Sequence, residues 1–163
     1  MNIITYILIL ILVIVVALLL NKYDELHKVK NAISFKESMD LIELPIVTFR
    51  IDGKKVNFLL DTGANDSVIH KGLLKTLPHI KCEEKAEVLA VNGETMITNI
   101  VKMKLSYKNN QYEELFRAAD LIGIIKQIKS KSGVTLHGII GNQFMEKYKY
   151  VLDFKDLIAY SKA

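Results

Sequence analysis

The residues best placed to do chemistry lie where an apolar segment, 58–60, ends in the tripeptide Asp61-Thr62-Gly63. A second apolar segment, Val68–Ile69, leaves the turn that these residues would form. A carboxylate fixed at a strand end can take up or release a proton as a general base or acid. Asp, Thr and Gly are also common in ordinary polar turns, so the tripeptide alone is a weak signal. A partner motif elsewhere in the chain has to decide between the two interpretations.

A second motif, Gly138-Ile139-Ile140-Gly141, is followed by a predicted short helix over 142–147. A predicted pair of strands, 150–154 and 157–160, comes last. Between the two motifs, Asn92-Gly93 separates strand-like segments, and this dipeptide strongly favours a tight hairpin turn. The two motifs are therefore separated by at least one predicted hairpin.

The other predicted elements are short and end at clear turn or stop residues. They are a hairpin at Asp52-Gly53 between strands 46–51 and 56–60, and a short helix over 71–77 that Pro78 stops. Apolar residues at helical spacing over 121–128 predict a further helix, with Asp120 as its N-cap. The pattern predicts one mainly β domain with two or three short helices.

The order of these motifs resembles that of the retropepsin-like (clan AA) aspartic proteases. Asp61-Thr62-Gly63-Ala64 matches the catalytic turn of that family, and Ile139-Ile140-Gly141 matches its second signature. Segment 88–97 stands where the family has its flap. The resemblance covers roughly 44–160, and the helix before the second signature is similar to that of the bacterial, membrane-anchored members. It implies a closed β-barrel-like domain at 44–163 that hydrolyses peptide bonds.

The resemblance also implies roles for single residues. Asp61 would activate water, Thr62 would stiffen the turn across a dimer axis, and Gly63 would let backbone approach closely. The residues expected to contact substrate are Ala64, Asn65 and Asp66 in the turn and Val91, Asn92 and Gly93 in the flap. Retroviral members often place an aspartate and an arginine where this chain has Asn65 and Asn142, so that ion pair is not expected.

One such turn supplies only half of the chemistry. Peptide hydrolysis by two carboxylates needs one as base and one as acid, close enough to share a proton. The chain has a single Asp-Thr-Gly, so we expect a C2 homodimer that joins two copies of Asp61 and acts on peptides or proteins. Two alternatives stay open: a peptide-binding or regulatory module of the same fold with little or no proteolysis, and a small β domain with an accidental resemblance.

Ala64 leads to a separate hypothesis about pH. Many acid-acting members of the family have serine at this position, whose hydroxyl donates to the carboxylate and stabilises its ionised form. Alanine lacks that donor, which makes ionisation of the paired carboxylates harder. We therefore expect activity nearer neutral pH than that of pepsin-like enzymes.

Residues 1–20 carry no charged side chain, whereas the rest of the chain has the charge content of an ordinary globular domain. As a helix, the apolar run 3–20 would be about 27 Å long, near the thickness of a bilayer core. It lacks a preceding basic residue and a small-residue cleavage site, so a retained transmembrane helix contacting the bilayer is favoured over a signal peptide. A polar stalk is expected at 21–43. Lysines on the C-terminal flank would place the domain in the cytoplasm.

Composition narrows the partners further. The net charge is only +4, and no basic stripe is interleaved with aromatic residues, which argues against nucleic acid. The four histidines lack metal-ligand spacing, and Cys82 has no paired base near it in the sequence. Neither a metal nor a cofactor is expected. No second apolar run reaches bilayer length, which excludes a multi-spanning membrane protein.

Overall fold

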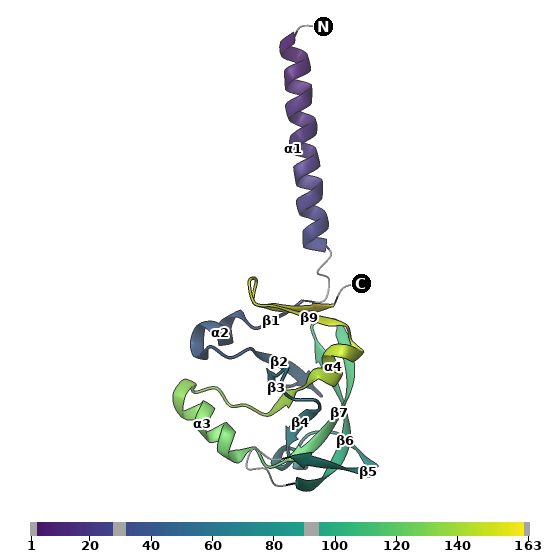
Figure 1. Cartoon of the computed structure of the whole chain (residues 1–163), viewed down its shortest axis with the longest axis vertical. Helices are drawn as coiled ribbons and strands as arrows, with labels where there is room; N and C mark the ends of the chain where they lie inside the picture. Colours follow the sequence, from purple (N-terminus) through teal and green to yellow (C-terminus); the bar gives the residue numbers. More distant parts are fainter. Residues whose placement is uncertain (1–2, 28–31, 90–94, 162–163) are drawn as a thin grey trace.

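The computed structural model describes residues 3–27, 32–89 and 95–161, with side chains for 5–20, 32–85 and 97–161. A long helix, α1 (Ile3–His27), precedes a mainly β domain (Figure 1). The strands are β1 (Ile33–Ser34), β2 (Ile46–Ile51), β3 (Lys54–Leu60), β4 (Ser67–His70), β5 (Ile80–Leu89), β6 (Thr95–Tyr107), β7 (Asn110–Ala119), β8 (Gly138–Ile140), β9 (Tyr150–Asp153) and β10 (Ile158–Ser161). The other helices are α2 (Lys36–Ile42), the 3-10 helix η1 (Lys71–Lys75), α3 (Ile122–Ser132) and α4 (Asn142–Lys147).

Seven of these strands form one sheet, in the order β2-β3-β8-β4-β7-β6-β5. A further pairing of Arg50 with Ser106 joins β2 to β6, so the sheet curls back on itself. A second sheet has the order β1-β10-β9. The predicted mainly β architecture is confirmed, whereas closure into a barrel stays a prediction.

The predicted hairpin at Asp52-Gly53 is confirmed. Both residues have positive φ angles, 50° and 76°, as a tight turn between twisted strands requires. The predicted turn at Asn92-Gly93 lies outside the described residues, although β5 and β6 pair antiparallel as far as Leu89 with Thr95. The final strand pair and the short helix α4 also match the prediction.

The predicted helix after residue 120 is present, with a correction at its start. Leu121 occupies the N-cap position, and Asp120 stands one residue earlier. Its carboxylate still satisfies the helix, because Oδ1 accepts the backbone N–H of Ile122 over 3.1 Å. Leu121 and Ile125 are buried against Ile46 and Leu136. The apolar face of α3 therefore belongs to the core, as expected.

The main core lies inside the curled sheet and is rich in aromatic rings. Phe49 contacts both Phe58 and Phe144, with ring centroids 6.0 Å apart in each pair. Phe58 in turn stacks on Phe116 at 5.3 Å. All four rings are nearly inaccessible to solvent, so β2, β3, β7 and α4 are fixed relative to one another around one hydrophobic centre.

Part of the predicted stalk belongs to the domain instead. β1 pairs with β10, with Ile33 opposite Ala159. The side chains of Ile33 and Phe35 are each 1% exposed, and the Phe35 ring contacts Phe154. Burial of these two large side chains gives the segment a reason to fold onto the domain. The folded unit thus begins before residue 44, where the resemblance placed its boundary.

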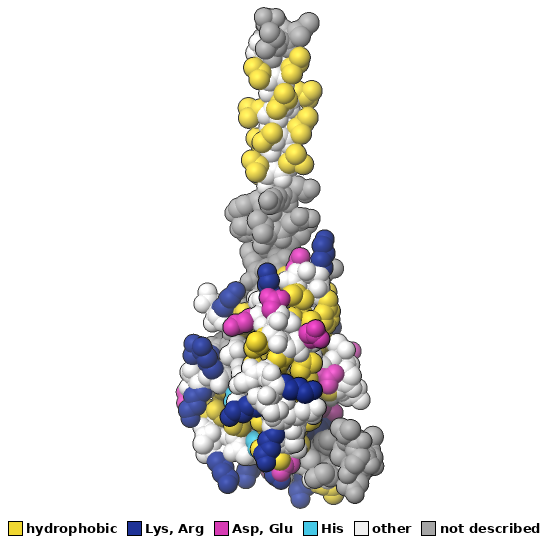
Figure 2. Space-filling view, turned by 90° about the vertical axis from the view of Figure 1, so that its left-hand side faces the viewer, with side chains coloured by type: hydrophobic (Ala, Val, Ile, Leu, Met, Phe, Trp, Pro, Cys, Tyr) yellow, Lys and Arg dark blue, Asp and Glu magenta, His cyan; other side chains and the backbone are white. Residues whose placement is uncertain are grey.

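The structure overturns the prediction of a membrane anchor. Within the described residues, no helix is long and apolar enough to cross a membrane. The helix α1 continues beyond the apolar run to His27. The predicted single-pass location with a cytoplasmic domain is therefore wrong, and the described residues give no support to the predicted transmembrane helix at 1–20 or to its bilayer contact. Figure 2 shows the apolar side chains exposed along the described part of α1.

Candidate active site

The pairing of β3 with β8 joins the two sequence motifs. These strands run parallel, and Leu60 lies opposite Ile140, so their ends meet at one edge of the sheet. The backbone N–H of Asp61 then donates to the carbonyl of Ile140 over 3.0 Å. The start of the turn at Asp61 is thereby fixed by a strand from a distant part of the chain.

Two hydrogen bonds fold the turn itself. The Oδ1 atom of Asp61 accepts the backbone N–H of Gly63 over 2.8 Å, and the Asp61 carbonyl accepts the N–H of Ala64 over 3.2 Å. Asp61 is half-buried, whereas Thr62 and Gly63 are exposed. Among the described residues, no group binds Oδ2 of Asp61. The Gly63 N–H thus orients the carboxylate through one of its oxygens.

The start of α4 supports the far side of the turn. Gly141 leaves no room for a side chain, because an added Cβ would lie 2.6 Å from the carbonyl carbon and oxygen of Asp66. Asn142 donates its backbone N–H to the Ala64 carbonyl over 2.8 Å and its Nδ2 to the Thr62 carbonyl over 2.7 Å. The sequence drew attention to Asn142 only for a missing charge, yet its amide ties α4 to the turn.

A buried polar pair, Ser67 and Glu114, supports the same region from inside. The two residues are 0% and 3% exposed. The Ser67 hydroxyl donates to Oε1 of Glu114 over 2.8 Å and accepts the N–H of Gly141 over 3.2 Å. Burial raises the pKa of Glu114, and the hydrogen bond from Ser67 opposes that shift in part. The pair was missed, although Glu114 alternates with apolar Tyr112 and Phe116 and so reads as inward-facing.

Asp66 forms an ion pair that the sequence did not reveal. Its Oδ2 lies 2.6 Å from Nη2 of Arg117, and both side chains are about a quarter exposed, 24% and 23%. Parallel pairing of β4 with β7 sets Val68 opposite Arg117 and brings the charges together. The Asp66 carboxylate therefore has an ion-pair partner within the same chain. The sequence contains only two arginines, Arg50 and Arg117, and this rarity was the only signal that could have drawn attention to Arg117.

The structure brings together six of the nine predicted site residues, those from Asp61 to Asp66. Ala64 is half-buried, and Asn65 is exposed with its carbonyl accepting the N–H of Gln143 over 3.1 Å. The other three, Val91, Asn92 and Gly93, lie outside the described residues. Their predicted contact with substrate stays a prediction.

Other aspartates outside the turn have structural partners. Asp120 lies 3.0 Å from the ammonium of Lys71, and Asp153 accepts the backbone N–H groups of Lys155 and Asp156. Asp52 occupies the hairpin turn. None of these three repeats the setting of Asp61, which follows β3 where that strand ends beside β8.

The described histidines also have structural contacts. Nδ1 of His137 accepts the N–H of Asn57 over 3.0 Å, and Nδ1 of His70 accepts the N–H of Leu121 over 3.2 Å. Burial lowers the pKa of His137, which favours its neutral form. Within the described residues, no group of three or more His, Cys, Asp or Glu side chains could hold a metal ion.

Comparison with known proteins assigns this fold and turn to a class and a family. A solved structure that matches is EIAV protease complexed with the inhibitor HBY-793, at 20% identity and a TM-score of 0.52. The match covers 70% of this chain and 96% of that one, which confirms the retropepsin-like fold. The sequence model of the family described as "gag-polyprotein putative aspartyl protease" matches residues 47–146, more than half of the chain. The chain belongs to this family of aspartic proteases. A search of curated proteins found no match.

Proposed function

We propose that the chain is an aspartic endopeptidase that acts as a homodimer, with Asp61 of each protomer at one shared site. The observation that carries the proposal is the Asp61-Thr62-Gly63 turn at the joined ends of β3 and β8 in a retropepsin-like fold. The turn orients one carboxylate oxygen through Gly63. This is the geometry that a fixed general base needs.

The paired carboxylates would hold one proton between them, because like charges at short range cannot both ionise. The ionised carboxylate takes a proton from water, and the water oxygen bonds to the carbonyl carbon of the peptide. The protonated carboxyl then supplies a proton to the leaving nitrogen as the C–N bond breaks. The products are a carboxylic acid and an amine, and the shared proton is restored.

An apolar face beside the turn supports the dimer. Phe154 is 56% exposed and Val151 is 37% exposed. Both line a hollow of about 730 Å³ that Thr62 and Asn142 also line. Large exposed apolar side chains favour contact with another surface, and here that surface would be a second copy of the chain. Such packing would place the two turns side by side.

Substrate is proposed to lie as an extended strand between the turn and the β5–β6 hairpin. Ala64, Asn65 and Asp66 would contact it from the turn. Val91, Asn92 and Gly93, between β5 and β6 in the sequence, would contact it from the other side. Closure of this hairpin would exclude water from the reaction.

The test compares the full-length wild type with Asp61→Asn on a peptide library. The variant keeps an oxygen for the Gly63 N–H but cannot act as a base, so kcat/KM should fall by roughly a thousandfold or more. Asp40→Asn, which removes an exposed carboxylate from α2, is the matched control and should keep full activity. Sedimentation velocity reports the association state in parallel.

Three outcomes would count against this proposal. Cleavage that survives Asp61→Asn would exclude Asp61 as the catalytic carboxylate. A monomer that cleaves would contradict the shared site. A folded dimer that binds peptides and cleaves none would favour the peptide-binding module.

Activity is expected nearer neutral pH than in pepsin-like enzymes, because Ala64 supplies no hydroxyl to the carboxylate. A pH–rate profile of kcat/KM measures this directly. A maximum near pH 3–4, close to the upper apparent value of about 4.7 for the pepsin dyad, would contradict it.

A further inference from the structure

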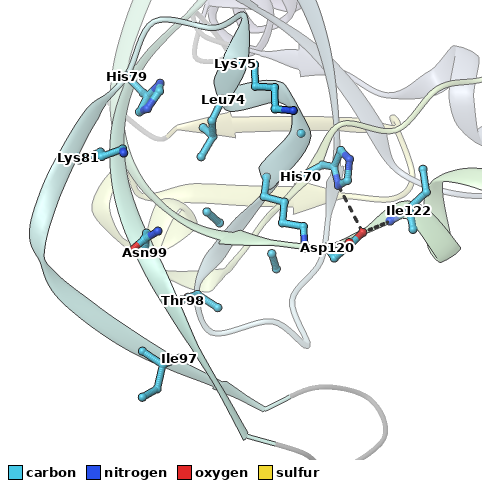
Figure 3. A pocket seen from close by; sticks show the side chains of 14 residues that line it. His70, Leu74, Lys75, His79, Lys81, Ile97, Thr98, Asn99, Asp120 and Ile122 are labelled. Carbon is cyan, nitrogen blue, oxygen red and sulfur yellow. Dashed lines mark hydrogen bonds and ion pairs between the residues drawn. The ribbon is translucent and has the colours of Figure 1, made fainter.

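A pocket of about 880 Å³, termed the lysine pocket, lies between η1, the base of the β5–β6 hairpin and the end of β7 (Figure 3). None of residues 61–66 lines it. In Figure 3, His79, Lys81 and Asn99 lie on one side, and His70, Lys75 and Asp120 lie on the other. A hollow of this volume can accept a ligand as large as a short peptide segment.

Positive charge dominates the lining of the lysine pocket. Lys71, Lys75 and Lys81 bring ammonium groups, and Asp120 brings the only carboxylate. That carboxylate is engaged, since it lies 3.0 Å from Nζ of Lys71 and accepts the N–H of Ile122. The backbone hydrogen bond first, and then Lys71, hold the pKa of Asp120 below its ordinary value. Within the part of the chain that the structure describes, no carboxylate pairs with Lys75 or Lys81.

Apolar side chains form much of the remaining surface, beside His70, His79, Thr98 and Asn99. Leu74, Ala118, Ala119 and Ile122 line the pocket, together with Ile97, which is 71% exposed. The lining contains no phenylalanine, tyrosine or arginine. Single-stranded nucleic acid binds by stacking bases on aromatic or arginine planes, and of these the lining offers only the imidazoles of His70 and His79, so it suits a nucleic acid less well than a peptide. A peptide that carries both acidic and apolar side chains fits both parts of the surface.

β4 connects the lysine pocket to the catalytic turn. It begins at Ser67, directly after the turn, and ends at His70, which lines the pocket. Four residues of extended chain span about 13 Å. A bound peptide in the extended form rises by the same amount per residue. A peptide with its scissile bond at Asp61 would therefore reach the pocket about four or more residues from that bond.

We propose that the lysine pocket binds an acidic segment of the substrate, with carboxylates paired to Lys75 and Lys81. The identity of the ligand as substrate rests on the proposed endopeptidase function. The binding of an acidic peptide does not rest on that function, because binding needs no cleavage. The pocket thus selects peptides that carry Asp or Glu at a distance from the bond to be cut.

The test measures binding to full-length Asp61→Asn protein, which keeps bound peptide intact. The probes are a fluorescein-labelled octapeptide of alternating Glu and Ala and its counterpart with Gln in place of Glu, followed by fluorescence anisotropy. The Glu peptide should bind roughly threefold to tenfold tighter, as two exposed ion pairs allow, and salt should weaken it. Adding Lys75→Gln and Lys81→Gln together should abolish the difference.

The control adds Lys126→Gln and Lys129→Gln, which remove the same charge from exposed positions of α3 outside the pocket. It should keep the preference for the Glu peptide. Equal affinity for the two peptides, or equal losses in the pocket and control variants, would overturn the proposal. Tighter, lysine-dependent binding of an eight-nucleotide oligothymidylate would overturn it in favour of nucleic acid.

Failure of the proposed function gives a different result. Wild-type protein that cleaves peptides without any acidic preference would refute the lysine pocket and leave the endopeptidase standing. If acidic peptide binds through Lys75 and Lys81 while no peptide is cleaved, the endopeptidase proposal is refuted and the lysine pocket stands.

Discussion

The turn at residues 61–66 and the lysine pocket lie at opposite ends of β4 and are built in opposite ways. In the turn, the N–H of Gly63 binds one carboxylate oxygen of Asp61. Asn142 donates to the carbonyls of Thr62 and Ala64. The buried pair Ser67–Glu114 binds the N–H of Gly141 through the Ser67 hydroxyl. In the pocket, two of the three ammonium groups have no partner among the described residues. One end of the strand is constrained, and the other is left open.

The difference reflects what each region has to do. A reacting carboxylate must stand in one place, because a misplacement of about 1 Å costs roughly a hundredfold in rate. Charge-based selection tolerates long, mobile side chains, since it depends on sign and proximity more than on angle. Changes in the turn should therefore affect folding and catalysis strongly, whereas changes in the pocket should affect ligand preference alone.

The largest effect on stability is expected from Gly141→Ala. The new Cβ would press on the carbonyl groups of Asp66 and Ala64, so the free energy of unfolding should fall by about 3 kcal/mol. Urea denaturation measures it. Gly123→Ala is the control, because no atom lies within 4 Å of its added Cβ and alanine favours a helix by about 0.5–1 kcal/mol. Equal stability of the two variants would show that the turn can move enough to accept a side chain at position 141.

An intermediate effect is expected from Glu114→Gln, and it depends on pH. The pKa of Glu114 is raised in the folded state, chiefly by burial, so the folded protein holds this proton more tightly than the unfolded chain. This contribution to stability is complete below the unfolded pKa and is lost as pH rises through the folded pKa. Lys147 and Ser67 oppose the shift, and Asp66 adds to it.

Melting temperatures from about pH 4 to about pH 8 check this expectation. Wild type should lose more stability than Glu114→Gln as pH rises. Glu37→Gln, at an exposed position of α2, should follow the wild-type curve. Parallel curves for wild type and Glu114→Gln would mean that the buried carboxyl does not titrate in this range.

The smallest effect is expected where the structure is open. Lys75→Gln with Lys81→Gln should change the free energy of unfolding by less than about 0.5 kcal/mol, because neither ammonium has a partner among the described residues. The same denaturation series measures it. A loss above about 1 kcal/mol would show that these lysines support the fold, and the contrast with the turn would then disappear.

Sequence reasoning succeeded where the signal was local. The turn at Asp52-Gly53 and the helix over 121–128 follow from short-range rules on positive φ and apolar spacing. The Asp61 turn and its partner at Gly141 were found through the motif order of a known family. Their contact depends on a parallel pairing that the order implies.

The errors concern groups whose partners are remote. Glu114 and Arg117 meet Ser67 and Asp66 only because β7 lies beside β4 in one register, and strand composition does not reveal that register. The segment containing Ile33 was assigned to a polar stalk, since its neighbours are polar and two buried residues leave little trace.

The pairing of β1 with β10 has a consequence for how the chain is made. Ile33 finds its position opposite Ala159, 126 residues later in the sequence, so the small sheet cannot form until β10 has been made. Domains fold as they emerge from the ribosome, and contacts between remote segments form late. A newly made chain would therefore carry Ile33 and Phe35 uncovered until β10 arrives. Loss of that strand through early termination would leave both side chains without their native cover.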